Sequence, residues 1–265
     1  MSSYQIVVCG GIVPDPLQTL EPAAGPALKN EMLLPHIFDP WATHALFEAG
    51  RLARAFAGSK VYLASLAPKA KLQQVIMTIA QRVPFELLAI DGPSSAFTDA
   101  GEVAGALAGA IESIPGLDKS RLLLFGGWES ASRCAGATLQ IIGERLGILD
   151  QFQGVDEITV LEDGSFRILE RIEGGQHQVS ICAGPPAVLG WATGNLPEPA
   201  NNPQIGMQNM RAMLPALQKA RAATLANGIH FTSVAVPRQQ RETRIVKDMP
   251  VDEIALEIMD WAAGE

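Results

Sequence analysis

Cysteine and histidine are scarce in this 265-residue chain, and neither is arranged for metal binding or cross-linking. Cys9, Cys134 and Cys182 lie far apart without a Cys-x-x-Cys pair, so we predict neither a disulfide framework nor a zinc knuckle. His36 and His44 are eight positions apart and lack the close spacing of two metal ligands on one helical face. We therefore predict no metal site.

Long apolar runs are also missing. The longest, such as residues 121–126, have the length of a strand, whereas a helix needs roughly 20 apolar residues to cross a bilayer. Residues 1–4 show neither the basic start nor the apolar stretch of a secretion signal. We expect a soluble cytoplasmic protein without membrane insertion.

Motifs of common enzyme classes are absent as well. The sequence contains no Gly-x-Ser-x-Gly, no His-Glu-x-x-His and no Gly-x-x-x-x-Gly-Lys-[Ser/Thr], the marks of a hydrolase elbow, a zinc protease and a P-loop. Gly10 and Gly11 follow a strand-like run, but the remaining glycines of the dinucleotide fingerprint do not follow them. We predict no catalytic residue in this chain.

Charge is distributed unevenly. The net charge of −8 argues against a general nucleic-acid binder, and we expect no nucleic-acid partner. Residues 201–247 carry seven basic side chains and one acidic one. Such a run usually means a solvated surface, and the alternative is a segment that docks on an acidic partner.

The first half of the chain alternates short apolar runs with segments of helical period. Strands are predicted at residues 5–9, 60–65, 86–90 and 121–126. Helices are predicted between and after them, at residues 39–58, 68–82, 99–114 and 130–146. This alternation predicts a doubly wound, mostly parallel α/β sheet, with ligands beyond the carboxyl ends of the strands.

The pattern changes after residue 150. An Asp-Gly turn at Asp163 and Gly164 separates two alternating runs and predicts a hairpin, and a second turn at Gly174 and Gly175 predicts a third antiparallel strand. We expect an antiparallel excursion over residues 151–184 within an α/β domain of residues 1–200. Residues 201–265, with helices near 208–225 and 251–263, form a predicted C-terminal partner-binding arm.

The order of these features resembles the β subunit of electron-transfer flavoproteins. The opening Ile6 to Asp15 is similar to that family's strand and Val-Pro-Asp loop, and His36-Ile-Phe-Asp39 stands where the family has Asn-Pro-Phe-Asp before a helix. Leu63 to Pro68, Arg171 to Gly175 and Pro186 to Leu189 match further family turns and strands. Glu198-Pro199 and Met210-Arg-Ala212 resemble pieces of the docking loop and arm. The resemblance covers residues 4 to about 262.

The resemblance implies a function in electron transfer. Such a β subunit pairs with a larger α subunit that carries most of the FAD, and the heterodimer passes electrons from a dehydrogenase, often an acyl-CoA dehydrogenase, to a quinone reductase or similar acceptor. The β subunit itself holds AMP in the ordinary branch and a second FAD in the electron-bifurcating branch. The chain would then be an electron carrier and not a stand-alone enzyme, because the flavin performs the redox chemistry.

Strand-end geometry and the matching motif positions together indicate the nucleotide site. We expect contacts to adenine, ribose and phosphate from Cys9, Gly10, Asp39, Ser65, Leu66, Gly127, Ser130, Ser132, Arg133 and Thr138. The resemblance also implies partner docking by Ile205, Met207, Met210 and Arg211. Each group has a plainer explanation, since Asp39 and the serines can cap helices, Cys9 can be a small core residue, and methionines at helical spacing are usually core.

The sequence departs from the family at the phosphate loop. The family's Gln is replaced by Trp128, an acidic position by Ala131, and the lysine of the opening loop by Gly11. Ser130, Ser132 and Arg133 can still bind phosphate, together with the free amides of the following helix. Two other interpretations therefore stay open: a degenerate structural subunit without nucleotide, and a stress-type ATP-binding module.

Overall fold

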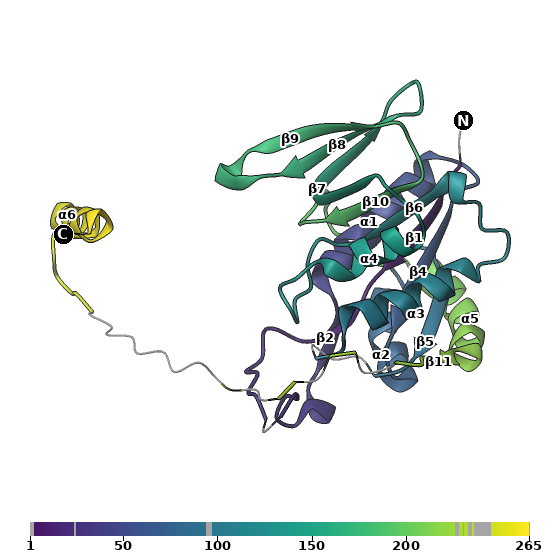
Figure 1. Cartoon of the computed structure of the whole chain (residues 1–265), viewed down its shortest axis with the longest axis horizontal. Coiled ribbons are helices and arrows are strands. Elements are labelled where there is room, and N and C mark those ends of the chain that lie inside the picture. Colours follow the sequence, from purple (N-terminus) through teal and green to yellow (C-terminus); the bar gives the residue numbers. More distant parts are fainter. Residues whose placement is uncertain are drawn as a thin grey trace. The chain divides into compact units, whose positions relative to one another are not determined.

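A nine-stranded, mostly parallel sheet organises the first part of the chain (Figure 1). The structure is a computed structural model, and it describes residues 3–23, 25–93, 97–225, 228–229, 231–232, 235 and 245–264. The strands lie in the order β11-β5-β4-β1-β6-β10-β7-β8-β9. This confirms the doubly wound α/β fold that the alternating pattern predicts.

Five parallel strands form the centre of the sheet. They are β5 (Glu86–Asp91), β4 (Lys60–Leu66), β1 (Gln5–Cys9), β6 (Leu122–Gly127) and β10 (Ala187–Trp191). The residues of β1 and β10 are buried throughout, as expected for strands covered on both faces. From β1 the chain builds outward first through β4 and β5, and then on the other side through β6 and β10. The topological switch point therefore lies between β1 and β6.

Helices cover both faces of this sheet. The core on one face contains residues of α1 (Pro40–Ala55) and α2 (Lys69–Ile79), and the core on the other face contains residues of α3 (Ala100–Glu112) and α4 (Ala137–Arg145). Between β1 and α1 the chain forms a small antiparallel pair, β2 (Ile12–Pro14) with β3 (His36–Phe38). Single helical turns η1, η2 and η3 lie at Glu31–Leu33, Lys119–Arg121 and Glu173–Gly175.

The predicted antiparallel excursion is confirmed at one edge of the sheet. β7 (Gln151–Val160) pairs in parallel with β10 and antiparallel with β8 (Phe166–Arg171), and β8 pairs with the edge strand β9 (His177–Cys182). Asp163 accepts the backbone N–H and the hydroxyl of Ser165 in the connecting turn. The β8 residues Phe166 and Ile168 belong to the same buried cluster as α1, so the hairpin continues the main core.

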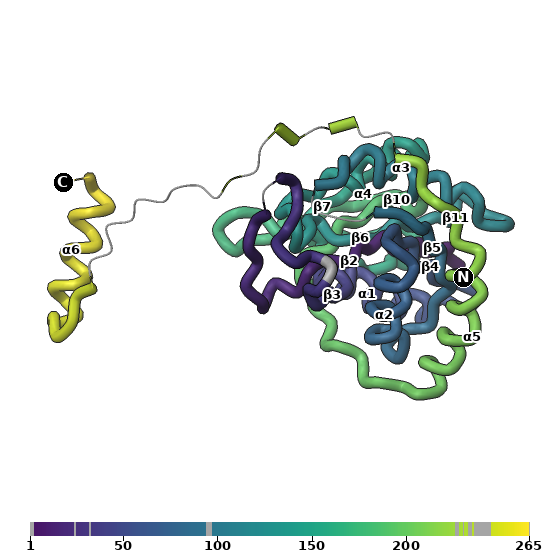
Figure 2. The backbone as a smooth tube through the Cα atoms, turned by 90° about the horizontal axis from the view of Figure 1, so that it is seen from below, coloured from purple at the N-terminus to yellow at the C-terminus, as the bar shows by residue number. Residues whose placement is uncertain are grey.

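The segment after residue 200 returns to the sheet. α5 (Pro203–Lys219) runs beside α2 and β5 (Figure 2), and β11 (Arg221–Ala222) then adds to β5 as the other edge strand. Asn202 and Pro203 start α5 five residues before the predicted helix, because the Asn202 side chain accepts two backbone N–H groups of the first turn.

One buried amide attaches α5 to the turn before β5. The Asn209 Oδ1 accepts from Phe85 N at 3.1 Å, and its Nδ2 donates to Ala80 O and Val83 O at 2.7 and 2.8 Å. Met213 and Leu217 on the same helix are buried in the core. α5 is therefore attached to the sheet by both hydrogen bonds and apolar contacts.

The chain divides into two units at residues 234 and 235. The second unit contains α6 (Val251–Ala263), a helix with four acidic residues and no basic one, which matches the predicted last helix. Three arginines of the predicted basic segment, Arg238, Arg241 and Arg244, lie outside the described residues. Within the described part of the chain, no helix is long and apolar enough to cross a membrane.

Candidate functional site

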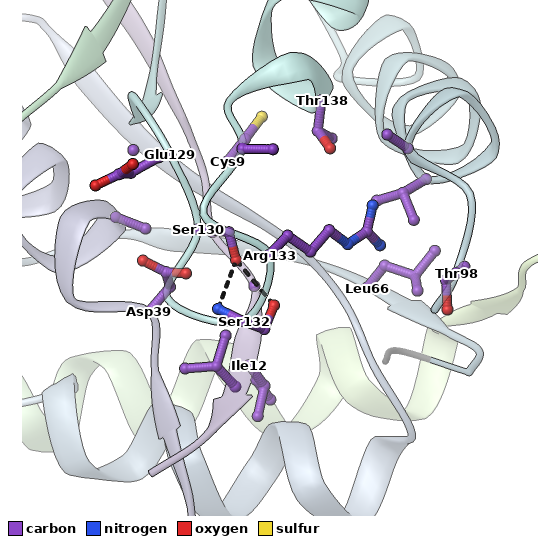
Figure 3. A pocket seen from close by; sticks show the side chains of 18 of the residues that line it. Cys9, Ile12, Asp39, Leu66, Thr98, Glu129, Ser130, Ser132, Arg133 and Thr138 are labelled. Atoms are coloured by element: carbon purple, nitrogen blue, oxygen red, sulfur yellow. Dashed lines mark hydrogen bonds between the residues drawn. The ribbon is translucent and has the colours of Figure 1, made fainter. Parts of the chain in front are cut away.

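A pocket opens at the carboxyl ends of β1, β4 and β6 (Figure 3). It therefore lies at the switch point of the sheet, where doubly wound folds bind ligands. The starts of α1, α3 and α4 contribute to its wall, and so does the loop of residues 128–136 between β6 and α4. Nine of the ten predicted nucleotide residues line it: Cys9, Gly10, Asp39, Leu66, Gly127, Ser130, Ser132, Arg133 and Thr138.

Ser65 is the one predicted residue that does not line the pocket. Successive residues of a strand point to opposite faces, and Leu66 belongs to the buried cluster under α3 and α4, where the pocket opens. Ser65 points to the other face, on which its neighbour Leu63 packs. Its hydroxyl is fully buried and makes no hydrogen bond in the described structure.

The loop of residues 128–136 is not helical, contrary to the prediction of a helix from Ser130. It folds on itself: the amides of Arg133 and Cys134 both donate to Ser130 O, and Cys134 then takes a left-handed conformation with φ of 51°. The Ser130 hydroxyl accepts from Ser132 N and contacts the Ser132 hydroxyl at 3.0 Å. α4 begins only at Ala137, which leaves room for the pocket beside Ser130 and Ser132.

Two glycines permit this loop. A Cβ on Gly136 would stand 1.7 Å from the carbonyl oxygen of Trp128, and a Cβ on Gly127 would stand 2.7 Å from the carbonyl oxygen of Glu129. Both obstacles are backbone atoms, which cannot move without moving the loop. Any larger residue at either position therefore requires another loop conformation.

Asp39 connects the loop to α1. Its Oδ1 accepts from Trp41 N at 3.1 Å and caps α1, as the Asp-Pro sequence predicts. Its Oδ2 accepts from Ala131 N, also at 3.1 Å, and the Ser130 hydroxyl bonds to the same carboxylate. The side chain is 4% exposed, and burial outweighs these hydrogen bonds, so its pKa is raised. Asp39 thus faces the pocket but already binds protein groups.

The start of α4 is left open to the pocket. Gly136 is its N-cap residue and provides no side-chain hydrogen bond, and the first turn contains no acidic residue. Gly136, Ala137 and Thr138 all line the pocket. The first amides of a helix have no partner within it and carry a partial positive charge, so this end suits an anion.

Arg133 brings a full positive charge to the same pocket. In Figure 3 its side chain extends from the loop towards the side where Leu66 and Thr98 lie. Burial lowers the pKa of its guanidinium, and the nearby Asp99 carboxylate raises it. An arginine remains charged despite such a shift, so Arg133 can form charge-assisted hydrogen bonds with a phosphate.

Three carboxylates also line the pocket, those of Glu31, Asp39 and Glu129. His36 lies on the same wall, with Nδ1 donating to Leu34 O at 2.6 Å and Nε2 therefore accepting from Lys71 Nζ at 3.1 Å. Burial and the charge of Lys71 lower the pKa of this imidazole, so it is neutral at pH 7. The formal charge of the described lining side chains is therefore negative, and the positive charge near an anion would come from Arg133 and the backbone amides of α4.

The start of α3 is the part of the wall that sequence reasoning missed. Thr98, Ala100, Val103 and Leu107 line the pocket, and the last two add to its apolar surface beside Leu66. Asp99 followed by Glu102 is a helix-start signal, and this helix follows a parallel strand. Because helices that follow parallel strands begin near the carboxyl edge, that signal was sufficient to place residues 98–103 at the pocket.

The predicted docking residues lie on α5, which contributes nothing to the pocket wall. Met207 and Arg211 are exposed, whereas Ile205 and Met210 are half-buried and Met210 packs against the core. The methionines of this helix therefore divide between surface and core.

One thiol lines the pocket among the described residues, that of Cys9. Burial raises the pKa of that thiol to about 12, which keeps it protonated at neutral pH. No protein-family model matches this chain, and a search of curated proteins finds no match either.

Proposed function

We propose that this chain is the β subunit of a heterodimeric electron-transfer flavoprotein and binds an adenine nucleotide in the pocket at the switch point. The observation that carries the proposal is the combination at that point of an uncapped helix start, a half-buried arginine and an apolar wall. A phosphate fits the α4 amides and Arg133, and an adenine ring fits the wall of Leu66, Val103 and Leu107.

In this proposal the nucleotide is AMP or a second FAD, and the main FAD is carried by the α subunit. The heterodimer would receive electrons from a dehydrogenase in the cytoplasm and pass them to a quinone reductase or similar acceptor. The support for this wider role is the order of family-like segments along the sequence, which the confirmed fold accommodates from β1 to α5. The side chains of this chain orient the nucleotide and exclude water from it, and the flavin supplies the redox chemistry.

The degenerate structural subunit is the second candidate, and two observations favour it. The pocket is lined by three carboxylates and one guanidinium. The hydroxyls of Ser130 and Ser132 already bond to each other, and that of Ser130 also bonds to Asp39. A loop that is satisfied without ligand, in a negatively charged pocket, has less to gain from a phosphate.

One experiment separates these functions. The chain is co-expressed with an α subunit, the purified complex is denatured, and the released nucleotides are identified by mass spectrometry. One FAD with one AMP supports the ordinary type, two FAD support the bifurcating type, and one FAD alone supports the degenerate subunit. A stable monomer that associates with no α subunit and releases ATP would favour the stress-type module and contradict our proposal.

A further inference from the structure

Asp39 is placed between two elements that are far apart in the sequence. One carboxylate oxygen accepts from Trp41 N at the start of α1, and the other accepts from Ala131 N in the loop of residues 128–136. We propose that Asp39 is the positioning residue that holds this loop in its ligand-binding form, and not a ligand of the ribose. This inference rests on the proposed function, because it concerns the same pocket.

The cap alone does not account for an aspartate here. Capping α1 requires one oxygen, which serine or asparagine supplies as well as aspartate does. The second oxygen receives the amide of Ala131 in the loop, and the Ser130 hydroxyl also bonds to this carboxylate. A residue with a single acceptor would keep the helix and release the loop.

Burial supports the same assignment. Asp39 is 4% exposed, and the desolvation of its carboxylate outweighs the four hydrogen bonds that favour the charged form. Burial therefore disfavours a charged carboxylate at this position, and the hydrogen bonds that favour it come from both α1 and the loop.

The loop depends on its contact with Asp39, because few hydrogen bonds from outside the loop hold Ser130 and Ala131. Within the described structure, their other hydrogen bonds lie inside the loop, where the amides of Ser132, Arg133 and Cys134 donate to Ser130. Through Asp39, a turn that is closed on itself is attached to the rigid first turn of α1. The position of Arg133 relative to the α4 amides then follows from that attachment.

The test compares two variants of the full-length chain. Asp39→Ser keeps one oxygen for the α1 cap and cannot reach Ala131, whereas Asp39→Ala removes both contacts. Asp118→Asn serves as a control, because Asp118 caps a helical turn remote from this loop through Ser120. Hydrogen exchange of the peptide that contains Ala131 and AMP affinity by calorimetry are measured for each protein.

We expect Asp39→Ser to speed exchange in residues 129–135, leave the first turn of α1 protected, and weaken AMP binding about tenfold. Asp39→Ala should give the same loss of affinity and also expose the start of α1. Unchanged exchange in the loop would overturn the inference, and so would faster exchange with unaltered AMP affinity. If the wild-type chain itself binds neither AMP nor FAD, the proposed function fails, and the exchange result alone decides whether Asp39 holds the loop.

Discussion

The starts of α3 and α4 face the same pocket and are built in opposite ways. α3 begins with Asp99, whose carboxylate accepts from Glu102 N at 2.9 Å, so the helix finishes its own end. α4 begins with Gly136, which offers no side-chain acceptor. The start of α3 is thus closed by its own side chain, whereas the start of α4 has no side-chain acceptor and is where we propose that a phosphate binds.

α1 stands between these two cases. Asp39 caps its own helix like Asp99, but it also extends its second oxygen to the loop that precedes α4. The three helix starts therefore form a series. The start of α3 is closed by its own capping residue, the start of α1 shares its capping residue with the loop, and the start of α4 is open. Side-chain capping should contribute to stability at the closed and shared starts, and ligand binding should depend on the open start and the loop beside it.

The largest effect is expected where the open start is sterically blocked. Gly136→Ala places a Cβ 1.7 Å from the carbonyl oxygen of Trp128, so the loop must move, and we expect a loss of about 3 kcal/mol in the free energy of unfolding and no measurable AMP binding. Urea denaturation and calorimetry check this. Gly109→Ala is the matched control, since nothing lies within 4 Å of that Cβ inside α3, and it should stabilise the protein by about 0.5 kcal/mol.

The second effect concerns the charge beside the open start. Arg133→Ala should weaken AMP binding about tenfold, equivalent to about 1.4 kcal/mol, because it removes a charge-assisted hydrogen bond. Arg211→Ala on α5 removes the same charge from an exposed site and should leave AMP affinity unchanged while weakening association with an α subunit. Equal effects of the two variants in both assays would remove the distinction between loop and arm.

The third effect concerns the closed start. Asp99→Ala removes the α3 cap and should lower the free energy of unfolding by about 1 kcal/mol, measured by urea denaturation. AMP affinity should change by less than about twofold, because the capped amides serve the helix and not the ligand. A large loss of affinity with intact stability would show that α3 is also a ligand-binding end.

The smallest effect is a pH dependence at the shared start. The pKa of Asp39 is raised in the folded chain, so between its ordinary value of 3.8 and the raised value the folded state binds more protons than the unfolded state. Its contribution to stability is therefore fully present below the ordinary value and is lost as the pH rises through the raised one. The difference in unfolding free energy between wild type and Asp39→Ser should follow this course in a pH series. A difference that grows with pH would contradict the sign.

The four predicted parallel strands of the first half were predictable to within a residue because each is an apolar run. β1 at Gln5–Cys9 coincides with its prediction, and β6 at Leu122–Gly127 differs by one residue. The loop before α4 was not predictable, since the contact that shapes it joins Ala131 to a residue 92 positions earlier. Local propensity continues the helix back to Ser130, and tertiary contacts override it.

The strand ends that form the site were predictable from the sequence, but the face of the sheet on which each side chain lies was not. Cys9 and Leu66 follow from the carboxyl-edge rule, but Ser65 fails because adjacent strand residues face opposite sides. To know whether Ser65 or Leu66 points into the pocket, one must know where α3 and α4 pack.

The three hydrogen bonds of Asn209 have a consequence for how this protein can be divided and how it can evolve. A chain cut at residue 200 would lose the hydrogen bond from Phe85 N to the Asn209 side chain and would uncover the core that Met213 and Leu217 close. The first 200 residues therefore cannot be separated from α5 as an autonomous module. Substitutions that this helix tolerates should fall on its outer surface, at residues such as Met207 and Arg211, while its inner surface stays constant.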